Sequence, residues 1–293
     1  MARHALFGSN ALNPSLPFVT MDLDTVKHYH RPETVDAAPA WQAGEAWLAG
    51  GTWLFSEPQP DISSLIDLRG FDWPSLEADA LGLEIGATCT IHELNEFIAP
   101  HDWIAAPLLK ECCRSLLASF KVWNEATVGG NLCMALPAGA MISLTAALEG
   151  VCTLWPRHGA PREMSVIDFV TGNHQNALAP GELLRSIWLP ASALRKHYAF
   201  RRFSLTASGR SSVLLIGTLC PKTGAVVLTI TAATVKPVQL VFREFPSPMA
   251  VHEVINENVP FDHYLNDPHG SPTHRRHLTY YYAEKILQEL AMI

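Results

Sequence analysis

Two glycine-containing segments carry the residue types that could bind an anionic ligand. Residues 49–52 read Ala-Gly-Gly-Thr and follow a short apolar stretch, while residues 127–131 read Thr-Val-Gly-Gly-Asn. Paired glycines permit turns that other residues resist, and without a Cβ their main-chain N–H groups can converge on an anion. A threonine hydroxyl can donate to a phosphate oxygen. Either segment alone is typical of an ordinary turn, but the two together favour a phosphate-bearing ligand at their junction.

The sequence lacks the other common signatures of nucleotide and acyl chemistry. There is no Gly-x-Gly-x-x-Gly, no P-loop and no Gly-x-Ser-x-Gly, which disfavours a Rossmann dehydrogenase, a P-loop NTPase and an α/β-hydrolase. The pairs His28/His30 and His274/His277 have no carboxylate or cysteine partner at ligand spacing, so we expect no metal site. Spacing alone assembles no catalytic triad or carboxylate pair, so no catalytic residue is assigned.

The six cysteines do not have the pattern of a metal cluster or a disulfide framework. No pair shows the Cys-x-x-Cys spacing of zinc and iron–sulfur sites. The chain is long and its beginning does not resemble an export signal, which makes disulfides improbable. We therefore expect six ordinary buried thiols and no cluster held by this chain.

The composition is that of a globular protein. Of 293 residues, 48% are hydrophobic and 17% charged, which gives material for about two domains. The formal net charge of −7 argues against a nucleic-acid partner, because such proteins present a basic face. No apolar run is long enough for a transmembrane helix, and a cytoplasmic protein is expected. Whether translation starts at Met1 or Met21 is left open.

Hydrophobic periodicity predicts the elements that must position the glycine segments. Residues 1–20 are expected to form an irregular arm, and a boundary is expected near residue 190. Thr90 followed by Glu93 has the spacing of a helix capping box. A short helix is expected to begin at Pro32, and residues 124–131 are interpreted as a glycine-bearing loop. A short strand is expected to open residues 28–36, and the segments 167–169 and 183–189 are expected to flank a polar loop. The other predicted elements are strands at 46–49, 62–68, 81–87, 151–155, 198–203, 212–220 and 225–234 and helices at 103–118, 141–148 and 275–293.

Together these segments resemble the FAD-binding, or medium, subunits of molybdenum hydroxylases, the xanthine dehydrogenase and carbon monoxide dehydrogenase family. The resemblance covers residues 22–293 and rests on the order of the motifs as well as on the glycine segments. Besides those segments, the matching stretches are His28–Pro32, Ile66–Leu68, Ile85–Ala87, Asp168–Gly172, Pro180–Leu184 and Gly270–Leu278.

The resemblance implies an α+β, PCMH-type FAD-binding fold. Two α/β subdomains, about 21–55 and 56–190, would hold FAD between them, and a C-terminal antiparallel sheet with helices, 191–293, would cover the flavin. The two glycine segments would wrap the pyrophosphate, and Leu183 and Phe200 would lie near the isoalloxazine. The cofactor-binding residues so implied are Trp47, Leu48, Ala49, Gly50, Gly51, Thr52, Trp53, Thr127, Val128, Gly129, Gly130, Asn131, Leu183 and Phe200.

The chain departs from the family pattern at three places. Trp123 stands where the family commonly has an arginine, and Ala140 where it has an aspartate that reaches the cofactor's sugar hydroxyls. A further aspartate usual near the flavin is not evident between Ser208 and Val213, and Arg201 or Arg202 is a candidate donor to the ring instead. Each lost hydrogen bond would weaken FAD binding by about 1–2 kcal/mol.

The resemblance implies an oxidoreductase role with partner chains. The protein would be an FAD-carrying electron-transfer subunit that takes electrons from a [2Fe–2S] small subunit and passes them to an external acceptor. A large subunit with the molybdenum cofactor would hydroxylate the substrate, and the three chains would form a dimer of heterotrimers. Two alternatives stay open: a flavin-free structural or interaction subunit with the same fold, and a self-contained flavin oxidase. The substrate and the acceptor (NAD⁺, a quinone or O₂) are not specified by the sequence.

Overall fold

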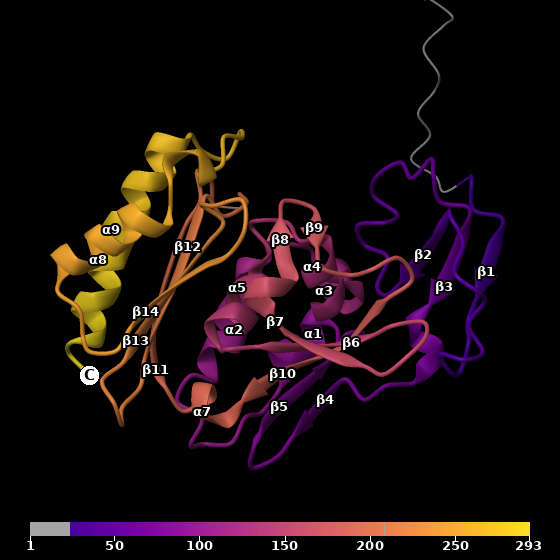
Figure 1. Ribbon diagram of the computed structural model, residues 1–293, viewed down its shortest axis with the longest axis horizontal. Coiled ribbons are helices and arrows are strands. Elements are labelled where there is room, and N and C mark those ends of the chain that lie inside the picture. Colours follow the sequence, from indigo (N-terminus) through magenta and orange to yellow (C-terminus); the bar gives the residue numbers. More distant parts are fainter. Residues whose placement is uncertain (1–23, 208) are drawn as a thin grey trace, which may run out of the picture.

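The computed structural model describes residues 24–207 and 209–293. The expected N-terminal arm and Met21 lie outside these residues. Three parts follow one another along the long axis of the molecule (Figure 1). A small sheet from the first part of the chain occupies one end, a larger sheet with helices occupies the middle, and the C-terminal sheet with its two helices occupies the other end.

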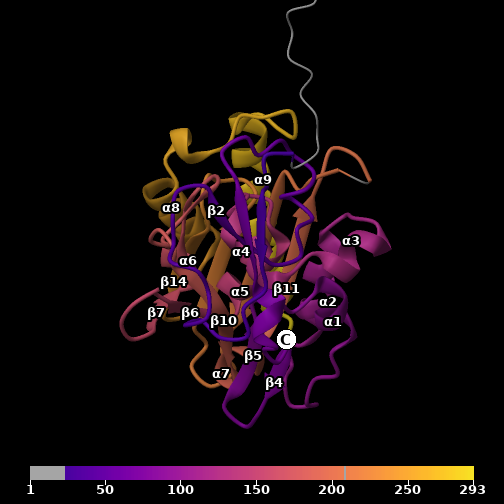
Figure 2. The same cartoon turned by 90° about the vertical axis from the view of Figure 1, so that its right-hand side faces the viewer.

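The first part is a three-stranded parallel sheet with the order β1-β3-β2; Figure 2 views the molecule from this end. Its elements are β1 (His28–His30), β2 (Glu45–Leu48), β3 (Ser64–Asp67) and the short 3₁₀ helix η1 (Leu68–Phe71). The central strand of this sheet, β3, is fully buried and begins at Ser64. The sheet therefore extends beyond the subdomain boundary expected near residue 55.

The helix expected to begin at Pro32 is not formed. Turns occupy this stretch instead, with backbone bonds from Ala37 to Thr34 and from Ala38 to Val35. Pro39 follows within seven residues, and so short a segment forms few intrahelical hydrogen bonds to offset the cost of nucleation.

The middle part has a five-stranded sheet with the order β4-β5-β10-β6-β7, in which all neighbours are antiparallel. Helices pack on this sheet and share its main hydrophobic core, which includes Leu83, Ile85, Leu109 and Leu144. The elements are β4 (Leu76–Ala78), β5 (Gly82–Gly86), α1 (Ile91–Glu96), α2 (Pro107–Ser115), α3 (Phe120–Glu125), α4 (Val128–Met134), α5 (Ala140–Ala147), β6 (Val151–Trp155), β7 (Arg162–Ser165), α6 (Val166–Phe169), β8 (Val170–Gly172), β9 (Gln175–Asn176), β10 (Leu183–Pro190) and α7 (Ala191–Leu194).

The capping box predicted at Thr90 is confirmed. The Thr90 hydroxyl accepts from the Glu93 N–H at 3.1 Å, and the Glu93 carboxylate accepts from the Thr90 N–H at 2.7 Å. The next N–H, of Ile91, donates to the Ala126 carbonyl at 2.9 Å. The start of α1 is therefore tied to the residue that precedes the second glycine segment.

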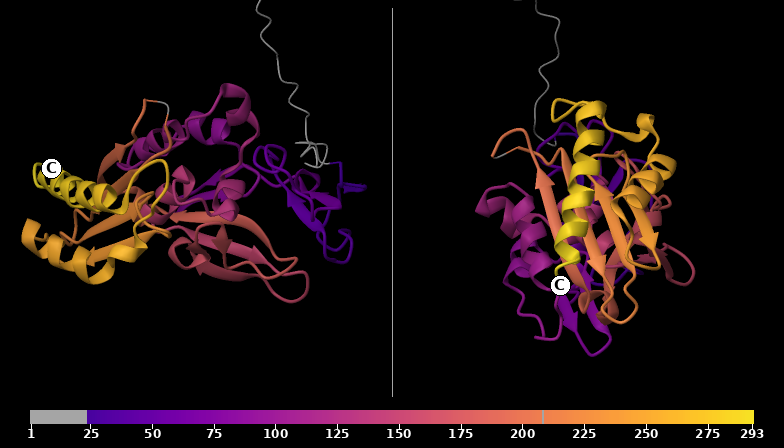
Figure 3. Two further views of the ribbon diagram at one scale, coloured as in Figure 1. Left: turned by 90° about the horizontal axis from the view of Figure 1, so that it is seen from above. Right: turned by 90° about the vertical axis from the view of Figure 1, so that its left-hand side faces the viewer.

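The C-terminal part is a four-stranded antiparallel sheet with the order β11-β12-β13-β14. Its outer face is covered by α8 and α9 (Figure 3), and its inner face rests on α5, where the hydroxyls of Ser143 and Thr231 are 2.7 Å apart. The strands and helices are β11 (His197–Phe203), β12 (Val213–Leu219), β13 (Val226–Thr231), β14 (Val238–Phe242), α8 (Pro248–Asn258), η2 (Phe261–His263) and α9 (Pro272–Leu290). Neither α9 nor any other helix of the described residues could span a membrane.

All six cysteines are free thiols. Four are buried, and burial raises the pKa of the Cys112 thiol well above its ordinary value. Cys133 and Cys220 are only partly buried, so the prediction of six buried thiols is wrong for these two. Cys220 comes directly after β12, where the chain turns at the surface.

An ion pair between a buried carboxylate and an exposed arginine fixes the entry to β10. The Glu182 side chain is 4% exposed and accepts from Arg162 Nε at 2.7 Å, from Arg162 Nη2 at 2.6 Å and from the Ala179 N–H at 3.0 Å. These bonds, chiefly those from Arg162, lower the pKa of Glu182 although burial opposes them. The carboxylate form is thus favoured in the folded chain.

We predict that Glu182→Gln destabilises the protein most at neutral pH. A lowered folded-state pKa contributes stability above the unfolded value of about 4.3, and this contribution is lost as the pH falls through the folded value. In urea unfolding the difference between wild type and Glu182→Gln should therefore shrink below about pH 4. Glu163→Gln, at an exposed position of β7, is the control. A difference that stayed constant from pH 7 to pH 3 would contradict the role of this ion pair.

Candidate cofactor site

The principal cavity lies where the three parts of the molecule meet. Its volume is about 800 Å³, toward the upper end of the roughly 300–1,000 Å³ range of small-molecule sites. The first part contributes residues 47–54, and the middle part contributes the segments around α3, α4 and the start of α5 together with the β8–β9 turn. The C-terminal part contributes residues 209–211, Ala232, Leu265, residues 267–269 and Arg275. A ligand here would contact all three parts.

The first glycine segment forms an open turn with free donors. The main-chain N–H groups of residues 50–54 donate to no acceptor among the described residues, and Gly51 has φ +69°, a left-handed conformation that glycine adopts readily. A Cβ on Gly50 would lie 1.7 Å from the Glu125 carbonyl oxygen, so this turn packs backbone to backbone against the end of α3. Consecutive N–H groups in such a turn form a binding site for an anion.

Trp47 lines the cavity, but its unpaired indole donor is buried behind the wall. The indole ring packs against Trp41 and Phe71, with ring centroids 5.5 and 6.5 Å away. Its Nε1 is buried and has no hydrogen-bond partner in the described chain. An atom that faced the cavity would be accessible, so this N–H points into the aromatic cluster behind the wall rather than toward the ligand space.

The second glycine segment is not a loop. Thr127 is the N-cap of α4 and its hydroxyl accepts from the Gly130 N–H at 3.0 Å. The Val128 and Gly129 N–H groups donate to the carbonyls of Cys89 and Ala87, at 2.8 and 3.1 Å. The expected convergence of free N–H groups is therefore wrong for this segment. It contributes a wall to the cavity rather than donors.

The two glycines of α4 meet different surroundings. A Cβ on Gly129 would lie 2.6 Å from the Ala87 carbonyl oxygen, whereas a Cβ on Gly130 would meet only the Thr127 hydroxyl within 4 Å, at 2.8 Å. Gly129 is thus required for packing α4 against the strand region, while Gly130 presents bare backbone to the cavity. Asn131 accepts from the Met141 N–H at 3.1 Å and so ties α4 to α5.

Most of the residues implied by the resemblance line the cavity, and four do not. Val128 and Gly129 are buried behind the wall. Leu183 packs with Leu68 and Phe71 in a separate small cluster, and Phe200 packs against the main core. The residues that do line the cavity are Trp47, Leu48, Ala49, Gly50, Gly51, Thr52, Trp53, Thr127, Gly130 and Asn131.

The positions where the chain departs from the family pattern have structural roles. Trp123 donates from Nε1 to the Leu116 carbonyl at 3.0 Å, which holds α3 against the end of α2. Ala140 is 1% exposed at the start of α5. Arg201 pairs with Glu289 at the surface of the C-terminal part. Trp123, Ala140 and Arg201 do not line the cavity, whereas Gly209, Arg210 and Ser211, from the stretch that lacks the family's further aspartate, do.

His174 is a cavity residue that the sequence did not indicate. Its ring centroid lies 5.5 Å from that of Trp53, so the β8–β9 turn and the first glycine segment meet here. His174 has φ +55° and its N–H donates to the carbonyl of Ala135, itself at φ +49°. This left-handed backbone conformation costs on the order of 1 kcal/mol for a residue with a side chain. No sequence pattern predicts it here.

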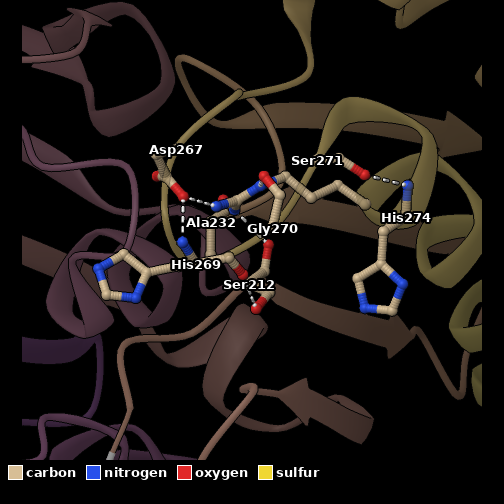
Figure 4. Close-up of polar contacts among 8 residues, drawn as sticks. Ser212, Ala232, Asp267, His269, Gly270, Ser271 and His274 are labelled. Atoms are coloured by element: carbon tan, nitrogen blue, oxygen red, sulfur yellow. Dashed lines mark hydrogen bonds and ion pairs between the residues drawn. The ribbon is translucent and has the colours of Figure 1, made fainter.

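Arg275 is the second unanticipated residue. Its side chain is 1% exposed, yet the residue contributes to the cavity wall. Its guanidinium donates to the carbonyls of Ser212, Ala232 and Gly270 and pairs with Asp267 (Figure 4). Burial lowers the pKa of Arg275, although an arginine stays charged.

The contacts of Arg275 shape one side of the cavity. The carboxylate of Asp267 that pairs with this arginine also accepts from the His269 N–H at 2.8 Å. The guanidinium therefore holds the segment from Asp267 to Gly270 against the C-terminal sheet, and this segment faces the ligand space. Among the described residues, no three His, Cys, Asp or Glu side chains are grouped to hold a metal ion.

These features fit a dinucleotide with a pyrophosphate. The free N–H groups suit an anion, Gly130 leaves backbone open where a side chain would intrude, and the aromatic wall suits planar rings. Residues 23–192 match the model of a family described as the FAD binding domain in molybdopterin dehydrogenase. The chain belongs to this family. The resemblance drawn from the sequence is confirmed, and the domain is an FAD-binding one.

The chain is also similar to individual proteins of this kind. The carbon monoxide dehydrogenase medium chain of Afipia carboxidovorans is 29% identical over 169 residues, which are 57% of this chain and 54% of that one. The match thus spans about half the length of this curated relative.

Solved structures match over most of this chain. A chain of reconstituted CO dehydrogenase from Oligotropha carboxidovorans has a TM-score of 0.74 and 21% identity, covering 89% of this chain and 96% of that one. A chain of quinoline 2-oxidoreductase from Pseudomonas putida 86 has a TM-score of 0.68 and 20% identity over the same shares. At such identities these likenesses establish the fold, and they confirm the α+β architecture.

We predict that Gly130→Val abolishes FAD binding in a protein that still folds. The new side chain would displace only the Thr127 hydroxyl and would project into the cavity, where it excludes the ligand. Circular dichroism should show a native spectrum and extraction should recover no flavin, with Gly130→Ala retaining an intermediate amount. Gly129→Ala is the contrast, because its Cβ meets backbone and the variant should fail to accumulate. Full flavin content in folded Gly130→Val would contradict the assignment of Gly130 to the wall of the FAD site.

We also predict that Arg275→Lys destabilises the protein by about 3–5 kcal/mol, the usual effect of breaking a buried charged network. A single ammonium group cannot serve three carbonyls and a carboxylate arranged around a planar guanidinium. Urea unfolding measures the loss. Arg276→Lys, whose guanidinium contacts Asn256 at an exposed site, is the matched control, and equal stability of the two variants would contradict the assigned role of Arg275.

Proposed function

We propose that this chain is the FAD-carrying electron-transfer subunit of a multi-subunit molybdenum hydroxylase. The flavin would accept electrons from a [2Fe–2S] small subunit and deliver them to an external acceptor. The observation that carries the proposal is the row of free N–H groups at residues 50–54, placed in a cavity that all three parts enclose. Membership of an FAD-binding family makes the pyrophosphate of FAD the fitting anion for this row.

The chain's own residues would bind and orient the cofactor. The turn at Gly50 and Gly51 would hold the pyrophosphate through main-chain donors, which need no reorganisation because Gly50 packs rigidly on Glu125. Trp53 and His174, which meet across two parts of the molecule, would limit access of water to the bound ligand.

The proposed assembly contains two further chains, a [2Fe–2S] small subunit and a large subunit with the molybdenum cofactor, arranged as a dimer of heterotrimers in the cytoplasm. The similar Afipia protein is called a medium chain, which supports partners of smaller and larger size. The substrate would then bind to the large subunit. The negative net charge of −7 does not favour a nucleic-acid partner.

A flavin-free structural subunit is the second candidate, and one observation favours it. Trp123 and Ala140 occupy the positions of an arginine and an aspartate in the family pattern, and both are committed to packing. The carboxylate that reaches the sugar hydroxyls thus has no counterpart at Ala140. Loss of one such hydrogen bond costs about 1–2 kcal/mol, roughly tenfold in affinity, which a tight site can sustain.

The two candidates are separated by the flavin content of the purified protein. We predict the visible absorption of an oxidised flavin and release of FAD in an equimolar amount on heating, together with co-purification of iron–sulfur and molybdenum subunits when the partner chains are co-expressed. A colourless protein that takes up no added FAD would favour the structural subunit. Oxidation of a small substrate by the isolated chain would instead indicate a self-contained oxidase.

A further inference from the structure

Fixed charge is scarce along the wall of the cavity. Among the described residues that line it, the Asp, Glu, Lys and Arg side chains are only those of Arg210, Asp267 and Arg275. Asp267 and Arg275 pair with each other and leave no net charge. The charge of the cavity is therefore that of Arg210.

Arg210 itself has no partner within the described part of the chain. It takes part in no hydrogen bond, ion pair or ring contact there, and it is exposed at the cavity. The protein as a whole carries a formal net charge of −7. An unpaired cation at a cavity of an acidic protein creates a local positive potential that attracts an anionic ligand group.

The backbone that carries Arg210 is held in place by a different arginine. Arg202 Nε donates to the Ser211 hydroxyl at 2.7 Å, and Arg202 Nη2 donates to the Gly209 carbonyl at 2.7 Å. The Ser212 N–H also donates to the Phe203 carbonyl at 2.7 Å. Both neighbours of Arg210 are therefore fixed on the C-terminal sheet, while its own guanidinium remains available.

The two arginines thus have separate tasks. Arg202, which the sequence singled out as a candidate flavin donor, is partly buried and its donors are used within the loop. Arg210 presents a planar set of donors that suits the oxygens of a phosphate or another delocalised anion. Because Arg202 anchors the backbone on both sides of Arg210, less conformational entropy is lost when Arg210 binds a ligand.

We propose that Arg210 forms an ion pair with an anionic group of the bound dinucleotide, and that it thereby sets the affinity of the cavity and the salt dependence of binding. The inference rests on the proposed FAD function. Two groups of FAD offer this chemistry, the pyrophosphate and the flavin ring when it is reduced and deprotonated at N1.

The test compares Arg210→Gln and Arg210→Lys with wild type and with Arg243→Gln. Arg243 is exposed just after β14, outside the cavity and without a described partner, so its loss controls for net charge. Apoprotein is titrated with FAD and with ADP, which shares the pyrophosphate but lacks the flavin, at low and high sodium chloride. The midpoint potential of the bound flavin is measured as a third readout.

A pairing with the pyrophosphate predicts about tenfold or greater weakening of both FAD and ADP in Arg210→Gln, with a smaller salt dependence and partial recovery in Arg210→Lys. A pairing with the reduced ring predicts unchanged binding of ADP and oxidised FAD. In that case the midpoint potential falls by about 30 mV for each tenfold loss of affinity for the reduced form. Arg243→Gln should match wild type in every readout.

The outcomes also separate this inference from the proposed function. If wild type binds FAD and Arg210→Gln binds both redox forms with unchanged affinity and salt dependence, Arg210 is merely a surface charge and the inference alone fails. If wild type binds no FAD, the proposed function fails and the inference falls with it.

Discussion

The site depends on a contact between two stretches of backbone that leaves no room for a side chain. Gly50 approaches the Glu125 carbonyl so closely that a Cβ would overlap it, at 1.7 Å. This contact seats the first sheet against the end of α3, and residues 50–54, whose N–H groups have no acceptor among the described residues, line the cavity. The nearby Arg69–Glu125 ion pair is exposed on both sides and contributes at most about 1 kcal/mol. Steric fit rather than charge therefore sets the geometry.

The hydrophobic core is divided into three clusters, and the main one spans the middle and C-terminal parts, with Leu214 and Ile216 of β12 in it. The main core, the C-terminal core and a small aromatic cluster around Leu68, Phe71 and Leu183 are separate. Trp73 and Trp155 join the first part to the middle one, with ring centroids 5.6 Å apart and the Arg185 guanidinium 4.5 Å from the Trp73 ring. A ligand that contacts all three parts would add its binding free energy to their association.

The sequence predicted the elements whose signals are local. Strand β6 has the predicted bounds, Val151–Trp155, and its side chains alternate between buried and partly buried. Thr90 and Glu93 form the predicted capping box of α1. The second glycine segment is helical rather than the expected loop. Gly-Gly normally disfavours helix, but the Thr127 cap and the hydrogen bonds to the Cys89 and Ala87 carbonyls stabilise α4. In such a case tertiary bonds outweigh propensity.

The residues that sequence reasoning misplaced depend on long-range geometry. The pairing of β10 with β6 shifts register between Leu184 and Ser186, and a bulge changes which side chains face a given side. Both Leu183 and Leu184 are buried as a result, and Leu183 packs away from the cavity. Arg275 gathers Ser212, Ala232 and Asp267 from three separate stretches, so no local pattern could reveal it.

The substitutions within the family pattern change the kind of interaction on which the cavity relies. Ala140 is buried and offers no carboxylate, so ligand hydroxyls have no acceptor at that position. The wall also carries main-chain donors on the first part and an unpaired arginine on the C-terminal part. Both recognise negative charge rather than a sugar. On the proposed function, recognition would therefore be weighted toward the anionic groups of the dinucleotide, and because the donors and the cation lie on different parts, the ligand would link those parts.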